Sequence, residues 1–148
     1  MASLAGLPRL EVVRLKKVPL GDEGAAAAAG LAGLRLLDLT DCGMGPAGVA
    51  ALAESPRLAD LRWLDVSENA FGDEGAIALA GSPHLRRLGT LEMNQAGLSA
   101  EGVAALAESP ILAGVRDLLL WGNPFGDEGA EAWRLRRTSL NCGCSASF

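Results

Sequence analysis

The chain has 148 residues, of which 49% are hydrophobic, 4% aromatic and 21% charged, and its formal net charge at pH 7 is −5. This length and apolar content favour one domain with a continuous core. No run of 18 apolar residues and no basic, hydrophobic and cleavable leader is present, so we expect a cytoplasmic chain that neither spans a membrane nor is secreted.

A 27-residue period organises the sequence. Leucine-spaced segments begin at Leu34, Leu61, Leu88 and Val115, and a first copy begins at Leu10, 24 residues before Leu34. A period of roughly 20 to 50 residues is typical of stacked arrays, in which one unit buries its apolar face only against a neighbour. The five copies therefore predict a solenoid.

Each copy begins with a predicted strand. Leu64 and Val66 are two residues apart, so they lie on the same side of an extended segment, whereas Trp63 and Asp65 point the other way. The same spacing in the other copies predicts five short strands, near residues 10–15, 34–39, 61–66, 88–93 and 115–120.

The turn after each strand contains one position that differs between copies. It holds Val18, Cys42, Asn69, Ala96 and Asn123. A buried asparagine satisfies backbone groups of its own and neighbouring coils, which valine, cysteine and alanine do poorly. The sequence therefore predicts a broken asparagine ladder, in which the other three turns are held mainly by packing.

An alanine-rich helix is expected after each turn. Acidic residues in the first turn, such as Asp73 and Glu74, meet the positive end of the helix dipole, which explains them without a metal. Serine-proline pairs such as Ser82-Pro83 end the helices, because proline cannot continue one. The expected N-cap residues are Gly21, Gly45, Gly72, Ser99 and Gly126.

Two segments carry the most specific pattern, one from Leu64 to Asn69 and one from Gly72 to Ala80. Together they resemble leucine-rich repeats of the ribonuclease-inhibitor type, whose units pair a short parallel strand with a full helix. The resemblance implies an α/β fold, a right-handed solenoid of about five repeats with a curved parallel sheet on its concave face and helices on its convex face. We expect the array to cover residues 1–135 and an irregular or disordered tail to cover residues 136–148.

Residues with catalytic or metal-binding chemistry have simpler explanations. His84, the single histidine, falls in a helix-to-strand loop without a nucleophile motif, and Cys42 lies in the asparagine column. Cys142 and Cys144 allow a metal-ligand pair or a strained disulfide, but no further cysteine or histidine is near them in sequence and an ordinary tail is favoured. We expect no enzymatic activity, no cofactor and no metal site.

The outward-facing strand positions predict a binding face. Exposed tryptophans are enriched at contact hot spots, which favours a binding role. Asp38, Asp65 and Glu92 would face one another across neighbouring strands, a costly arrangement that fits a basic protein partner or, alternatively, the solvated face of an acidic protein. The residues expected to contact a partner are Arg14, Leu36, Asp38, Trp63, Asp65, Thr90, Glu92, Asp117, Leu119 and Trp121.

The predicted function is non-enzymatic protein–protein interaction at this face. Two alternatives remain open, a regulatory or effector protein of inhibitor, GTPase-activating or ubiquitin-ligase-adaptor type, and a fragment of a longer repeat protein without independent function. Nucleic acid is not expected as a partner, because phosphate binding needs clustered lysine and arginine, and the clusters around Lys16 and Arg136 lie at the margins of the array.

The N-terminal coil raises a separate question. Leu4 and Leu7 resemble the end of a preceding repeat, yet no polar capping unit comes before them. An uncovered strand edge invites pairing with another chain. The sequence is therefore compatible with self-association, with the end of a longer repeat protein, and with a truncated gene product.

Overall fold

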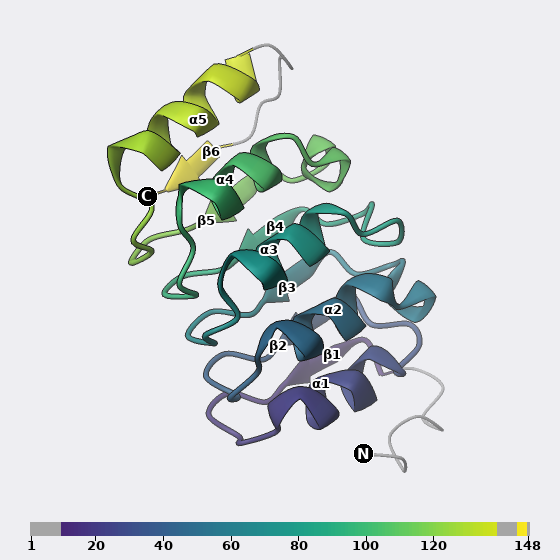
Figure 1. The fold of residues 1–148 in the computed structure, drawn as a ribbon. Helices are drawn as coiled ribbons and strands as arrows, with labels where there is room; N and C mark the ends of the chain where they lie inside the picture. Colours follow the sequence, from purple (N-terminus) through teal and green to yellow (C-terminus); the bar gives the residue numbers. More distant parts are fainter. Residues whose placement is uncertain (1–9, 139–144, 148) are drawn as a thin grey trace.

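A computed structural model describes residues 10–138 and 145–147 of the chain. Five coils follow one another, each with a strand and then a helix, which confirms the predicted α/β solenoid (Figure 1). Short 3-10 helices, Pro56–Leu58 and Pro110–Ala113, follow the second and fourth helices. The elements are β1 Val12–Arg14, α1 Gly21–Ala29, β2 Leu36–Asp38, α2 Pro46–Glu54, β3 Trp63–Asp65, α3 Gly72–Ala80, β4 Thr90–Glu92, α4 Ala100–Ala107, β5 Asp117–Leu119 and α5 Gly126–Thr138.

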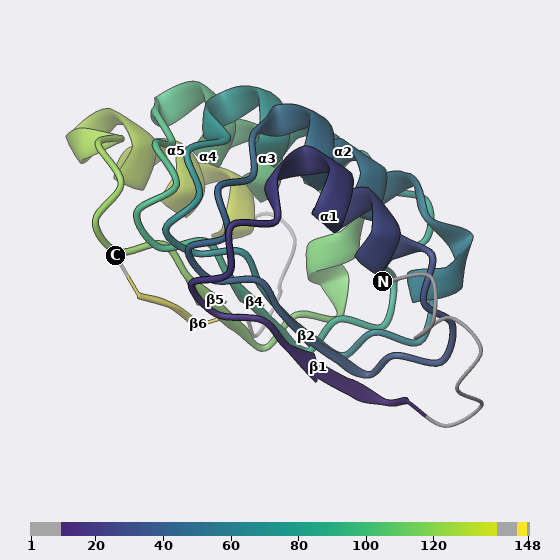
Figure 2. The same ribbon diagram turned by 90° about the horizontal axis from the view of Figure 1, so that it is seen from below.

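The strands form one parallel sheet in sequence order, and equivalent residues of successive coils pair in register. Leu37 pairs with Leu64 and Leu64 with Leu91, so one leucine column runs along the sheet. Figure 2 shows helices α1 to α5 along one side of the sheet, and no described element covers its other side. The uncovered side is the face on which the sequence predicts partner binding.

The core fills the space between sheet and helices. The leucines of the central column, Leu37, Leu64 and Leu91, are fully buried, and each contributes roughly 1.5–3 kcal/mol by leaving water. Alanines on the inner helix face, including Ala25 and Ala76, are also fully buried. Their small side chains allow the helices to lie close to the sheet, which explains the alanine-rich composition of each helix.

For the turns at Cys42 and Ala96, the asparagine column contradicts the expectation that turns without asparagine are held mainly by packing. Asn69 Oδ1 accepts hydrogen bonds from the backbone N–H of Cys42 at 2.9 Å and Met44 at 3.1 Å, both in the preceding coil. Its Nδ2 donates to the carbonyl of Leu39 at 2.8 Å and also to two carbonyls of its own coil. Asn123 bonds the turn at Ala96 in the same way. Each asparagine therefore serves two coils.

The helix N-termini are also stabilised by a neighbouring coil. Asp22 Oδ1 in α1 accepts from the N–H of Gly45 at 2.7 Å and Gly48 at 2.8 Å, at the start of α2. Asp73 in α3 binds the start of α4 equivalently, accepting from the N–H of Ser99 and Gly102. The carboxylates thus neutralise the positive end of the next helix as well as that of their own.

The predicted N-cap residues are confirmed at Gly45 and Ser99. At Gly21 and Gly72 the prediction is wrong, because the structure places the cap one residue earlier. Both glycines have a φ of +62°, a left-handed conformation that L-residues with a side chain adopt only at a cost. At these positions glycine is needed for the turn into the helix.

The helix C-termini follow the same principle. A serine follows each of the three helices α2, α3 and α4, and its hydroxyl donates a hydrogen bond to a carbonyl at the end of the helix one coil earlier. The donors are Ser55, Ser82 and Ser109, at 2.5 to 2.6 Å. These carbonyls have no partner within their own helix. Each serine lies at or just after the end of its own helix, directly before a proline, and bonds one of the last carbonyls of the helix one coil earlier.

The C-terminal part departs from the expected irregular tail. Helix α5 continues to Thr138, and Ser145–Ser147 forms a further strand, β6, which pairs in parallel with β5 (Figure 1). The pair Cys142 and Cys144 lies outside the described residues, as do Leu4 and Leu7. The predictions that depend on them stay predictions.

We predict that replacing Asn69 with alanine lowers the free energy of unfolding by about 3 kcal/mol, because buried backbone groups of two coils lose their partners. Urea denaturation followed by tryptophan fluorescence measures the loss. Asn94→Ala is the matched control, because Asn94 is also buried but its side chain accepts only from the N–H of Trp121, and its expected loss is about 1 kcal/mol. Equal losses in the two variants would contradict the account.

Candidate functional site

The uncovered side of the sheet presents columns of equivalent residues, as the repeat alignment predicts. The strand pairing confirms the first column, Val12, Leu36, Trp63, Thr90 and Asp117, and the second, Arg14, Asp38, Asp65, Glu92 and Leu119. The positions just after the strands add Lys16, Thr40, Ser67, Asn94 and Trp121. The predicted partner-binding residues are therefore brought together on one face.

The acidic residues of the second column are less exposed than the sequence predicts. Asp38 is only 1% exposed and Asp65 only 6%, whereas Glu92 is half-buried. The residues that contact the two aspartates, Lys16, Thr40 and Ser67, lie just after the strands. Direct contact of these two carboxylates with a partner is therefore not compatible with the structure.

Each buried aspartate has partners within the chain. Lys16 Nζ lies 3.2 Å from Asp38 Oδ2, and Thr40 donates its hydroxyl to Asp38 Oδ1 at 2.7 Å. The N–H of Ser67 donates to Asp65 Oδ1 at 2.9 Å. The hydrogen bond to Asp38, followed by the attraction of that carboxylate, raises the pKa of Lys16. A cation of the chain itself thus offsets part of the acidic column.

Trp63 is engaged in the same network. Its Nε1 donates to Glu92 Oε1 at 2.9 Å, and the guanidinium carbon of Arg14 lies 5.7 Å from the ring centroid. This distance is within the range of a cation–π contact. The half-buried Trp63 therefore contacts residues of both the first and the fourth coil. Its indole N–H and its ring already have partners within the chain.

Of Asp38, Asp65 and Glu92, only Glu92 is partly exposed, and its surroundings destabilise the ionised form of its carboxyl. Burial raises the pKa of its carboxyl, and the negative charge of Asp65 raises it further. The hydrogen bond from Trp63 acts in the opposite direction. The repulsion predicted from the sequence is therefore present at Glu92.

An exposed apolar group remains at the C-terminal half of the face. Trp121 is 48% exposed, and Leu119, two residues earlier, is half-buried. The backbone of Trp121 is fixed by the fourth coil, because its N–H donates to Asn94 Oδ1 and its carbonyl accepts from Gln95, both at 3.0 Å. Trp121 is therefore an exposed side chain on a rigid support.

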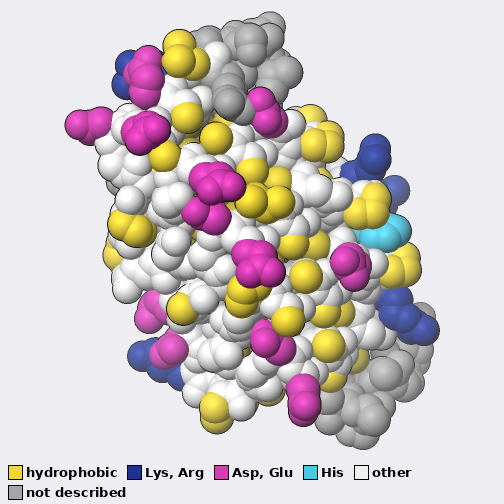
Figure 3. Space-filling view, in the orientation of Figure 1, with side chains coloured by type: hydrophobic (Ala, Val, Ile, Leu, Met, Phe, Trp, Pro, Cys, Tyr) yellow, Lys and Arg dark blue, Asp and Glu magenta, His cyan; other side chains and the backbone are white. Residues whose placement is uncertain are grey.

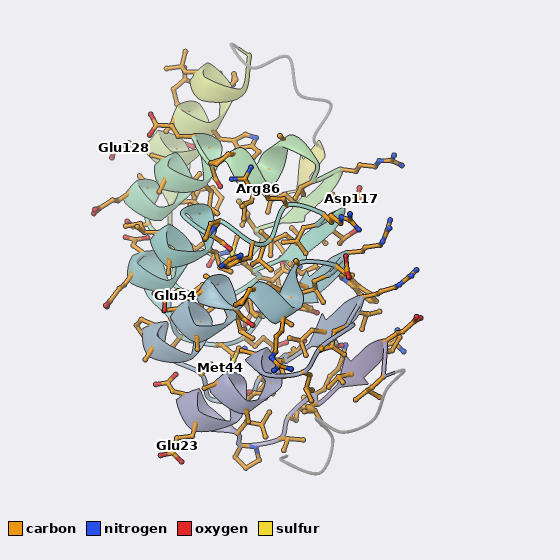
Figure 4. All side chains as sticks on the ribbon, turned by 90° about the vertical axis from the view of Figure 1, so that its right-hand side faces the viewer. Glu23, Met44, Glu54, Arg86, Asp117 and Glu128 are labelled. Atoms are coloured by element: carbon orange, nitrogen blue, oxygen red, sulfur yellow. The ribbon has the colours of Figure 1, made fainter. Side chains whose placement is uncertain are left out.

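Sequence reasoning missed a basic edge of the molecule. Arg62 and Arg116 occupy equivalent positions 54 residues apart, immediately before β3 and β5, and Gly89 lies between them before β4. With Arg87 they line a polar cavity of about 440 Å³. Figure 4 shows nitrogen-tipped side chains around the labelled Asp117, whereas acidic side chains, coloured magenta, are spread over the helical face in Figure 3. The signal was available in the repeat alignment, although no local run of basic residues reveals it.

The remaining candidates have structural roles. Cys42 is fully buried, donates its thiol hydrogen to the carbonyl of Leu15, and has a pKa raised by burial. His84 is half-buried in the loop after α3. Within the described part of the chain, no group of three or more histidine, cysteine, aspartate or glutamate residues is arranged to hold a metal ion. Among the same residues, no helix has the length and apolarity required to cross a membrane.

Comparison with protein families agrees with this architecture. Residues 34–53 and 59–80 match the family model described as Leucine Rich repeat. These segments are the second and third coils, and the other three coils have the same succession of strand, turn and helix. The fold is therefore a leucine-rich-repeat solenoid, whereas the ribonuclease-inhibitor subtype stays a prediction. A search of the curated proteins found no match.

We predict that the Glu92 carboxyl titrates above its ordinary value of 4.5 in a ¹³C-NMR experiment. Because the folded pKa is raised, the stability that Glu92 contributes is fully present below its unfolded pKa and is lost as pH rises through its folded pKa. Glu92→Gln keeps an oxygen that accepts from Trp63 but removes the charge, so the unfolding free energy should vary less with pH above about 4.5. An unchanged pH dependence in this variant, or a midpoint below 4.5, would refute the assignment.

Proposed function

We infer from the leucine-rich repeats and the uncovered sheet that this chain is a non-enzymatic protein-binding module whose partner contacts the concave face. Leucine-rich repeats generally mediate protein–protein interaction. The proposed contact is centred on Trp121 and Leu119 and extends to two residues of the first column, the half-buried Thr90 and the exposed Asp117.

The observation that carries the proposal is the exposure of Trp121. An indole ring that is 48% exposed leaves apolar surface in water, and its burial against a partner is favourable. Tryptophan is enriched among the few residues that dominate binding energy at interfaces. Because the backbone of Trp121 is fixed by two hydrogen bonds to the fourth coil, binding requires little ordering of the chain.

The charges of the face refine the expected chemistry of the partner. Asp38 and Asp65 are buried and have partners of their own, so they offer a basic partner no direct contact. Glu92 is partly exposed but accepts from Trp63. These contacts do not favour a strongly basic partner. The apolar end of the face, at Trp121 and Leu119, instead favours a partner that packs an apolar side chain against it.

The size of the face limits the partner segment that it holds. The five paired strands from β1 to β5 span on the order of 20 Å, since adjacent strands are about 4.8 Å apart. Val12, which is 49% exposed, lies in the first of these five strands, whereas Trp121 follows the fifth. A short segment or a single loop of a partner is therefore sufficient to cover the proposed contact.

We predict that Trp121→Ala abolishes partner capture by the immobilised chain, because loss of a hot-spot side chain typically weakens binding by about 30-fold or more. Proteins retained by the wild type and each variant are identified and quantified by mass spectrometry. Ile77→Ala is the matched control, because Ile77 is an apolar side chain of comparable exposure, 44%, on the helical side. Retention of the same proteins by all three chains would refute binding at this face.

A further inference from the structure

The turn that carries Trp121 has a glycine where the turns of the four preceding coils have a side chain. Gly122 has a φ of +74°, and φ is +50° to +57° at the equivalent residues Lys17, Asp41, Glu68 and Gln95. Because four residues with side chains adopt this left-handed conformation, the backbone alone does not require glycine here. A Cβ at Gly122 would lie only 2.7 Å from Cγ of Gln95. Gly122 therefore leaves room for the side chain of Gln95, which lies against the next coil.

This packing places the amide group of Gln95 beside the turn that carries Trp121. The backbone N–H of Gln95 donates to the carbonyl of Trp121 at 3.0 Å, and Cδ of its side chain lies 3.7 Å from the place that a Cβ of Gly122 would take. Gln95 is exposed. Its side-chain amide has no hydrogen-bond partner among the residues that the structure describes. One NH2 donor and one carbonyl acceptor are therefore available next to the exposed indole ring.

The two tryptophans of the concave face differ in the bonding of their indole N–H groups. Nε1 of Trp63 donates to Glu92 within the chain, at 2.9 Å. For Nε1 of Trp121, the described part of the chain provides no acceptor. A partner that covered the ring of Trp121 with apolar atoms alone would leave this donor buried and unsatisfied, which is costly. The partner must therefore bring a hydrogen-bond acceptor together with its apolar side chain.

We propose that Gln95 and the indole N–H of Trp121 select a partner segment in the extended conformation, an inference that rests on the proposed function. In an extended segment the backbone N–H and C=O of one residue point to the same side. The amide of Gln95 is able to bond both, its Nε2 donating and its Oε1 accepting, while a neighbouring carbonyl accepts from the indole of Trp121. A helix is a poor match, because its backbone groups are bonded internally except at its ends.

A titration with a short extended peptide tests the proposal on the full chain. ¹⁵N-labelled protein is titrated with acetyl-Thr-Leu-Thr-amide, and the resonances of the Gln95 side-chain NH2 and of Trp121 Nε1–H are followed. The expected result is a saturable shift of both resonances. Methylation of the leucine nitrogen of the peptide removes the N–H that bonds Gln95, and it should weaken binding by about fivefold.

Two variants separate the role of Gln95 from that of the indole ring. Gln95→Ala removes the amide and should weaken peptide binding by about tenfold. Gly122→Ala places a Cβ against the side chain of Gln95 but keeps both the amide and Trp121, and it should weaken binding by a similar factor. Glu68→Ala is the matched control, because Glu68 is an exposed side chain with the same backbone conformation one coil earlier. Its affinity for the peptide should equal that of the wild type.

Absence of a saturable shift at the side chain of Gln95 would overturn the proposal. So would an equal loss of affinity in Glu68→Ala, or tighter binding of an alanine-rich helical peptide with one central leucine than of the extended peptide. The titration needs no natural partner, so its outcome is independent of partner capture. If Trp121→Ala abolishes partner capture whereas Gln95→Ala leaves it unchanged, the proposed function stands and the selection of an extended segment fails.

Discussion

Backbone groups that a coil cannot satisfy by itself are the constraint on which this structure depends. A turn after a strand and both ends of a helix leave N–H and C=O groups unpaired, and burying them without partners is costly. Here a side chain of an adjacent coil supplies the missing partner. Asn69 serves the turn of the preceding coil, Asp73 the start of the following helix, and Ser82 the end of the preceding one. These hydrogen bonds hold successive coils in register, and in that register the leucine columns pack against one another.

The capping residues make the repeating unit two coils long rather than one. The asparagines that bond a neighbouring turn are two coils apart, as are Asp22 and Asp73, which bond the start of the following helix. The segments 48–56 and 102–110 have identical sequences, which shows the same double period. Coils that provide the asparagine and aspartate therefore alternate with coils that receive their hydrogen bonds. The second and fourth coils have no asparagine of their own, and the next coil supplies the partners for their turns.

The sequence predicts the scaffold better than the surface. The 27-residue period is sufficient for the strand register and the leucine core, since both depend only on spacing. The burial of Asp38 and Asp65 could not be predicted in this way, because it depends on how the side chains of adjacent strands cover one another. The role of Trp63 depends likewise on the reach of its ring to Glu92. The cavity beside Gly89 appears only when three coils are stacked, because what distinguishes it is a missing side chain.

The partner-binding proposal depends on a rigid scaffold, and the rigidity depends on the hydrogen bonds between coils. Native-state amide hydrogen exchange measures these bonds directly. The account predicts that the N–H groups of Cys42 and Met44, bonded to Asn69, and of Ala96 and Leu98, bonded to Asn123, exchange as slowly as the N–H groups of the sheet. Exchange of these four amides at nearly the unprotected rate would contradict it.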